Sequence, residues 1–209
     1  MYIVIKLIFY LCAFIILWAM VGYPLSLKVI SKFYKKSGLK KDYSYRPTVT
    51  VMVVAHNEEK VIKDKLENLM RLQYPKDKIE FLVSSDNSTD KTNDIVKEFI
   101  KSHPNEKIRL FEVKERKGKT NAQNEAQKTV TSEILVMTDA NSMLDEKSII
   151  ELVAVFTDKD ISYVCGRLVI INKDISDVSS SENTYWDRET KIRKIESDIK
   201  TITAGNGAL

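Results

Sequence analysis

The segment that ends in Asp139 and Asn141 combines a strand pattern with two side chains that can bind a metal ion. Residues 134–138 are apolar or β-branched, as expected for a buried strand. Residues i and i+2 near a strand end project to the same side, so both side-chain oxygens can face one point. Such a pair suits a divalent cation, Mg²⁺ or Mn²⁺, which takes oxygen ligands and holds phosphate groups. The alternative is that Asp139 forms an N-cap before the helix expected near Glu146.

A basic turn, Lys117-Gly118-Lys119, lies at the start of an expected helix at residues 119–130. The backbone N–H groups of a helix start, together with two ammonium groups, suit a diphosphate. The alternative interpretation is an exposed basic turn without a ligand. Asn124, further along the same helix, either satisfies a buried backbone group or reaches a bound ligand.

Asp86 follows another apolar strand and precedes a polar segment, residues 87–90, that can cap the next helix. The Asp86 carboxylate is therefore left to accept a hydrogen bond from a ligand N–H group. His56 has no cluster of cysteine or histidine around it, so we expect a turn residue there and no zinc site.

Apolar runs alternate with amphipathic segments through most of the chain. This alternation predicts βαβ units, hence an α/β fold with a mostly parallel sheet. We expect strands at 49–55, 79–84, 108–113 and 133–138, a helix at 146–156, a strand-like run at 161–171, a polar break at 179–181 and a charged helix at 182–201. Ligands of such sheets bind at the carboxyl ends of the strands. The polar clusters all follow expected strands, so we expect them along one edge: residues 56–58, 85–90, 116–119 and 139–141.

Residues 7–27 contain no charged side chain, and as a helix they would span roughly 30 Å, the thickness of a bilayer core. A cleaved signal peptide is the alternative, but its apolar core is usually shorter. Basic residues concentrate at 28–46, which predicts a single-pass protein of the cell membrane with its following domain in the cytoplasm. The position of this cluster favours a membrane surface as partner, and no nucleic acid is expected. The two cysteines lie far apart and fit a reducing compartment.

Four motifs, in register, resemble glycosyltransferase family 2 over about residues 47–172. They are Val-Thr-Val-Met-Val-Val-Ala-His-Asn-Glu-Glu from Val49, Ser-Asp-Asn-Ser-Thr-Asp-Lys-Thr from Ser85, Gly-Lys-x-x-Ala-x-Asn from Gly118, and Leu-Val-Met-Thr-Asp-Ala-Asn from Leu135. The resemblance implies a GT-A fold and the transfer, with inversion, of a sugar from a nucleotide diphosphate, usually UDP.

The resemblance also implies a donor-binding role for residues of each motif. The nucleoside pocket would be lined by Ala55, Asn57 and Glu58, and the base would be bound by Asp86. The diphosphate would lie near Lys117 and Lys119, and the metal motif would be Asp139 and Asn141. Two positions depart from the family pattern. Ser85 stands where an Asp is frequent, and Asn141 keeps an oxygen ligand but loses a charge.

Nothing after Asn172 supplies the general base or the Gln-x-x-Arg-Trp segment that the resemblance places in the C-terminal half. We therefore expect the base to lie beyond Leu209, and this chain to bind the donor but to transfer poorly. The expected organisation is a membrane anchor at 1–27, a basic linker at 28–47, a nucleotide-sugar-binding domain at 48–172 and the start of an acceptor-side region at 173–209.

The expected function is a membrane-anchored glycosyltransferase that makes a cell-envelope or extracellular polysaccharide or glycoconjugate, with a glycan or a lipid-linked molecule as acceptor. One alternative is a membrane partner that binds nucleotide without catalysis. Another is a nucleotidyltransferase on a related sheet. A nucleotidyltransferase usually carries a Gly-rich loop with Arg and Lys after the first strand, where this chain has His56-Asn57-Glu58-Glu59.

Overall fold

The computed structural model describes residues 2–34, 40–169, 177–199 and 202. The chain divides into two units, which we describe separately. One comprises Met1–Gly38 with Val169–Ala204, and the other comprises Leu39–Leu168 with Gly205–Leu209.

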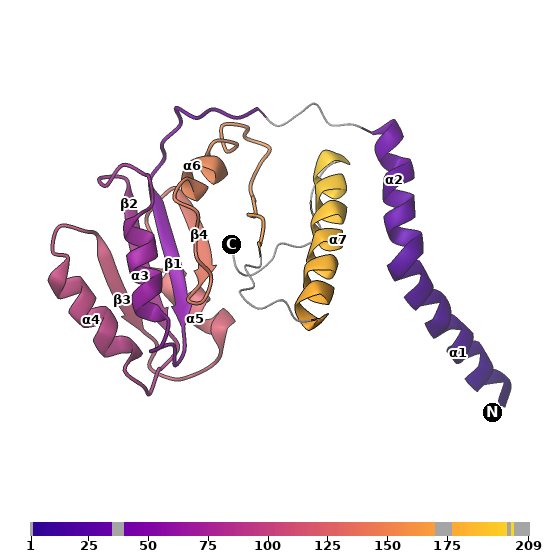
Figure 1. The fold of residues 1–209 in the computed structure, drawn as a ribbon, viewed down its shortest axis with the longest axis horizontal. Helices are drawn as coiled ribbons and strands as arrows, with labels where there is room; N and C mark the ends of the chain where they lie inside the picture. Colours follow the sequence, from indigo (N-terminus) through magenta and orange to yellow (C-terminus); the bar gives the residue numbers. More distant parts are fainter. Residues whose placement is uncertain (1, 35–39, 170–176, 200–201, 203–209) are drawn as a thin grey trace. The chain divides into compact units, whose positions relative to one another are not determined.

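The second unit is built on a four-stranded parallel sheet in the order β3-β2-β1-β4 (Figure 1). The strands are β1 (Val49–Ala55), β2 (Ile79–Ser85), β3 (Ile108–Glu112) and β4 (Ile134–Asp139). Every residue of β1 is buried, as expected for a β-branched strand with neighbours on both sides. Because Val54 pairs with Asp139 and Ala55 pairs with Ser85, the carboxyl ends of these three strands lie level. This edge carries the candidate site.

Helices cover both faces of the sheet. α3 (Ile62–Met70), α4 (Thr92–Ser102) and α6 (Ser148–Val153) contribute apolar side chains to the larger core cluster. α5 (Lys119–Gln127) packs Ala122 and Ala126 against Met52 and Leu82 on the other face. The connection that leads into β2 thus crosses one face of the sheet through α3, and the connection that leads into β4 crosses the other face through α5. β2 and β4 are the two neighbours of β1. Ligands of open α/β sheets bind where the strand order reverses in this way, here beside the end of β1.

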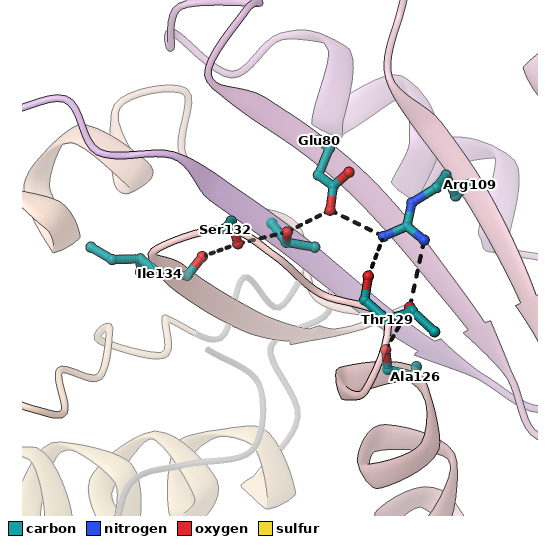
Figure 2. Close-up of polar contacts among 7 residues, drawn as sticks. Glu80, Arg109, Ala126, Thr129, Ser132 and Ile134 are labelled. Atoms are coloured by element: carbon teal, nitrogen blue, oxygen red, sulfur yellow. Dashed lines mark hydrogen bonds and ion pairs between the residues drawn. The ribbon is translucent and has the colours of Figure 1, made fainter.

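A polar network joins the strands at the opposite end of the sheet (Figure 2). The hydroxyl of buried Thr50 donates to Glu80 Oε1 at 2.7 Å, and its Oγ1 lies 2.7 Å from the Ser132 hydroxyl. Arg109 reaches the same Glu80 oxygen at 3.1 Å and the Thr129 carbonyl at 3.4 Å. Thr50, Glu80 and Arg109 are each the second residue of their strand, so the network links β1, β2 and β3 at the same level. Through Thr129 and Ser132 it also joins these strands to the segment between α5 and β4.

The first unit begins with an uninterrupted apolar helix made of α1 (Tyr2–Leu17), a π-helical stretch (Trp18–Gly22) and α2 (Tyr23–Phe33). It is longer than the segment expected at 7–27, and by length and composition it could cross a membrane. A Cβ at Gly22 would lie 2.5 Å from the Trp18 ring, so only glycine allows this indole to pack against the backbone.

Two expectations were wrong. The run at 161–171 forms no strand over its described part, 161–169, where Tyr163 and Val169 are more than half exposed. A strand needs a hydrogen-bonding neighbour, and β1 is the only strand paired with β4 in the described sheet. The break expected at 179–181 lies inside a helix, α7 (Asp177–Ile199), because serine lowers helix propensity only slightly.

Candidate donor-binding site

The structure connects all four polar clusters through contacts at the carboxyl edge of the sheet. The loop after β1 bonds to the loop after β2. Asp86, directly after β2, bonds to the turn before α5. Lys119, the first residue of α5, bonds to Asp139 at the end of β4. The expectation of a shared edge is thus confirmed by direct contacts.

Asp86 holds the basic turn in place. Its side chain is 2% exposed, and its two carboxylate oxygens accept the backbone N–H groups of Lys117 at 3.2 Å and Gly118 at 3.0 Å. The carboxylate is therefore already engaged, whereas the sequence suggested that it was left for a ligand. Each oxygen keeps a second lone pair, so a ligand N–H group can still be accepted.

Gly118 makes this turn possible. Its φ of 90° and ψ of 166° lie in a region that is essentially restricted to glycine. This conformation lets two successive N–H groups converge on Asp86 and starts α5 at Lys119. The first backbone bond of the helix is donated by Ala122 to the Gly118 carbonyl. The positive end of the helix therefore points toward the edge of the sheet.

Asp139 is the last residue of β4, and its carboxylate accepts a hydrogen bond from the Lys119 ammonium. Asn141 is exposed in the turn that follows, where the Ser142 N–H donates to the Asp139 carbonyl at 3.3 Å. Because Asn141 lies outside the strand, strand alternation does not orient it as the sequence suggested. The two residues still place a carboxylate and an amide two positions apart at this edge.

The donor set fits a hard cation that also takes ligands from elsewhere. No group of three His, Cys, Asp or Glu side chains that could hold a metal occurs in the part of the chain that the structure describes. Asp139 and Asn141 would supply two oxygens, which leaves coordination positions for phosphate oxygens and water. The Asp139 carboxylate forms an ion pair with the Lys119 ammonium.

The loop after β1 is tied to the loop after β2. Asn57 has a positive φ of 56°; its side-chain oxygen accepts the Thr89 N–H at 2.8 Å, and its own N–H donates to Ser88 Oγ at 3.2 Å. The Glu58 N–H donates to Thr92 Oγ1 at 2.8 Å. These bonds fix the backbone, while the Asn57 side chain is exposed and that of Glu58 is partly buried.

The remaining expected residues lie nearby with different exposure. Ala55 is buried, and its carbonyl accepts the Asp86 N–H at 2.9 Å. His56 Nδ1 lies 2.8 Å from the Asp86 carbonyl, in keeping with a turn residue. Lys117 is exposed and paired with Glu115 at 3.0 Å. Asn124 is exposed on α5, so its side chain is open to a ligand rather than buried against the backbone.

Two polar residues of α3, which the sequence did not single out, contact the segment after β4. Lys65 is fully buried and donates to Thr138 Oγ1 at 3.0 Å and to the Ser142 carbonyl. Burial lowers the pKa of its ammonium from about 10.5 to about 8, although the negative charge of Asp139 opposes this shift. Asn68 bonds twice to the backbone of Leu144. The sequence did indicate that Lys65 is buried, because position 65 falls on the apolar stripe of α3 with Ile62 and Leu69.

The sequence profile of Glycosyl transferase family 2 matches residues 50–208, about three quarters of the chain. This chain belongs to glycosyltransferase family 2. Its α/β architecture, with a parallel sheet flanked by helices, is the GT-A-like fold that the motifs implied. Membership of this enzyme family sets aside the nucleotidyltransferase alternative.

Two curated family 2 relatives match over 60% of the chain. The "Probable glycosyltransferase YdaM" of Bacillus subtilis is 34% identical over 128 residues, which is 30% of its length. The β-monoglucosyldiacylglycerol synthase of Nostoc sp. is 32% identical over 126 residues, which is 27% of its length. The chain therefore spans about a third of the length of these relatives.

A solved structure is similar as well. The mannosyltransferase of Pyrobaculum calidifontis, in complex with GDP-Man and Mn²⁺, is 34% identical with a TM-score of 0.64. The similarity covers 71% of this chain and 44% of that one. That mannosyltransferase thus binds a nucleotide sugar together with Mn²⁺.

Proposed function

We propose that this chain binds a nucleotide-diphosphate sugar, with UDP as the expected nucleotide, at the carboxyl edge of its sheet. It would serve as the donor side of an inverting glycosyltransferase. The observation that carries the proposal is the Lys119–Asp139 contact beside the Asp86-bound turn. It sets a cation, a carboxylate and a helix start at one point, and a diphosphate with a divalent cation needs such groups together.

Each group has a distinct task in the proposed site. Lys119 would turn its ammonium from Asp139 to the diphosphate, and Lys117 would add a second positive charge. Asp86 would keep the turn in place and accept a hydrogen bond from the base, while Ala55, Asn57 and Glu58 border the nucleoside. Asp139 and Asn141 would hold Mg²⁺ or Mn²⁺. When bound, the ion supplies positive charge to the departing diphosphate.

The proposed setting is the inner surface of the cell membrane. No residue of the helix Tyr2–Phe33 is buried, and the helix is apolar enough to serve as an anchor. Lys28 and Lys32 lie in the C-terminal half of α2, from which the chain continues to the sheet domain. Basic residues at this end of an anchor favour a cytoplasmic location for the domain that follows. The product would be a cell-envelope or extracellular polysaccharide or a glycolipid, made on a glycan or lipid-linked acceptor. The name of the Nostoc relative, a glycolipid synthase, supports the lipid option.

Calorimetric titration of UDP and GDP into the full chain in detergent, with and without Mn²⁺, tests the donor site. We expect Mn²⁺ to tighten binding of one nucleotide, and Asp139→Ala to lose that gain because it removes the charged ligand. The matched control is Asp77→Ala, which removes an exposed aspartate from the turn before β2, at the other end of the sheet. Equal affinity with and without Mn²⁺, or an unchanged gain in Asp139→Ala, would contradict the proposal.

A further inference from the structure

A series of hydrogen bonds holds the end of β4 and the segment after it against α3 and against the residues that follow α3. Lys65 contacts Thr138 and Ser142, and Asn68 contacts Leu144. Beyond the end of α3, the Gln73 N–H donates to the Glu146 carbonyl at 2.8 Å, and their side chains bond at 3.0 Å. The contacts follow the same order in both segments, so the segment runs beside the helix in the same direction.

The first contact is a buried one. Lys65 Nζ is the only charged atom on the apolar stripe of α3 defined by Ile62, Leu66 and Leu69. Burying an ammonium is unfavourable unless hydrogen bonds compensate for the lost water. Two acceptors of this ammonium, Thr138 Oγ1 and the Ser142 carbonyl, lie on either side of Asp139 in the sequence. The ammonium therefore bridges the strand end and the turn that carry the proposed cation ligands.

The second contact fixes the far end of the same turn. The Asn68 side chain accepts the Leu144 N–H at 2.8 Å and donates to the Leu144 carbonyl at 2.8 Å. The Asn68 amide thus satisfies both the N–H and the carbonyl of the Leu144 backbone, as a neighbouring strand would do. Leu144 itself is buried in the same core cluster as Ala140. The turn is thus held at both ends, by residues three positions apart on one helix.

We propose that Lys65 and Asn68 are positioning residues that form a clamp on the turn 139–144 and hold Asp139 and Asn141 in place for a divalent cation. The proposal rests on the cation site proposed above. Neither residue touches the ion; each acts through the backbone that presents the ligands. Partners that orient metal ligands in this way typically change metal affinity by 10–100-fold when they are removed.

The test measures, in the full chain, the Mn²⁺ concentration that gives half of the maximal gain in affinity for UDP or GDP, whichever binds more tightly. We expect Asn68→Ala and Lys65→Met each to raise this concentration by about tenfold or more. Affinity for the nucleotide without Mn²⁺ should change by less than about twofold, because the Asp86-bound turn is untouched. Lys63→Met is the matched control, since Lys63 is exposed on the same helix.

The sign of the Lys65→Met effect separates geometry from charge. Loss of a nearby positive charge would by itself strengthen cation binding, so weaker binding reports the lost hydrogen bonds. Asn68→Ala changes no charge and gives the same test without that opposing effect. Unchanged or tighter Mn²⁺ binding in either variant overturns the proposal, because the clamp requires both residues.

Two further readouts keep the outcomes distinct. A purely structural role would lower the melting temperature and the metal-free affinity together with Mn²⁺ binding, and that pattern also overturns the proposal. Asp139→Ala is measured in parallel. If it keeps the Mn²⁺ effect, the proposed cation site fails. If it loses the effect while Asn68→Ala and Lys65→Met keep it, only the clamp fails.

Discussion

Lys65 gives folding stability a pH dependence that can be isolated. Burial lowers the pKa of its ammonium in the folded state to about 8, whereas the unfolded chain keeps the ordinary value near 10.5. Below pH 8 both states hold the proton, and the folded state bears the full cost of burying a charge. Between about pH 8 and 10.5 only the unfolded state holds it, so the free energy of unfolding should rise with pH.

The measurement is urea unfolding of the wild type and Lys65→Met across that pH range. We expect the wild type to gain stability relative to Lys65→Met as the pH increases, and Lys63→Met to follow the wild type. Subtracting the curves removes the contribution of the other lysines. Parallel curves for the wild type and Lys65→Met would contradict the buried, proton-releasing lysine.

At the level of residues, the sequence predicted positions better than partners. The rule that strand ends share one edge brought Asp86, Lys119 and Asp139 together correctly. It could not show that Asp86 binds backbone N–H groups, because that contact depends on the positive φ of Gly118. Lys65 was missed for another reason. A single lysine on a helix is usually exposed, and only its phase relative to the apolar stripe indicates burial.

At the level of elements, the Thr50–Glu80–Arg109 network fixes how α5 returns to the sheet. We expect Thr50→Val to lower the free energy of unfolding by about 1–3 kcal/mol, because it removes a buried hydroxyl from two partners. Arg109→Met should cost less than about 1 kcal/mol, because its side chain is 43% exposed and exposed ion pairs contribute little. Urea unfolding of both variants compares the two losses of unfolding free energy. A larger loss for Arg109→Met than for Thr50→Val would contradict this prediction.

The strands were predictable to within one residue at most ends, because β-branched runs between polar turns leave few alternatives. Residues 161–169 have the same local pattern but pair with no strand of the described sheet, so pairing and not propensity decided the outcome. The helices were predicted in order, but several ended early. α5 stops at Gln127 rather than 130, and α6 spans only Ser148–Val153 within the expected 146–156.

At the level of the whole molecule, the helix Tyr2–Phe33 predicts stable attachment to membranes. We expect the full chain to stay in the pellet after alkaline carbonate extraction. The double variant Leu11→Arg, Ile15→Arg should move to the supernatant, since arginine at the centre of a membrane helix costs about 2.5–3.5 kcal/mol. Leu11→Ala, Ile15→Ala is the control and should remain membrane-bound. A wild type released by carbonate would contradict the anchor.

The order of strands also has a consequence for synthesis on the ribosome. β1 emerges early and pairs on one side with β2, to which β3 then adds. The other side of β1 stays open until β4 is synthesised, and the Thr48–Glu133 contact at the start of this pairing joins residues 85 positions apart. An unpaired apolar strand is a point of aggregation. The segment that closes this edge also carries Asp139. The nascent domain thus covers the open side of β1 and acquires its proposed cation ligand in the same event.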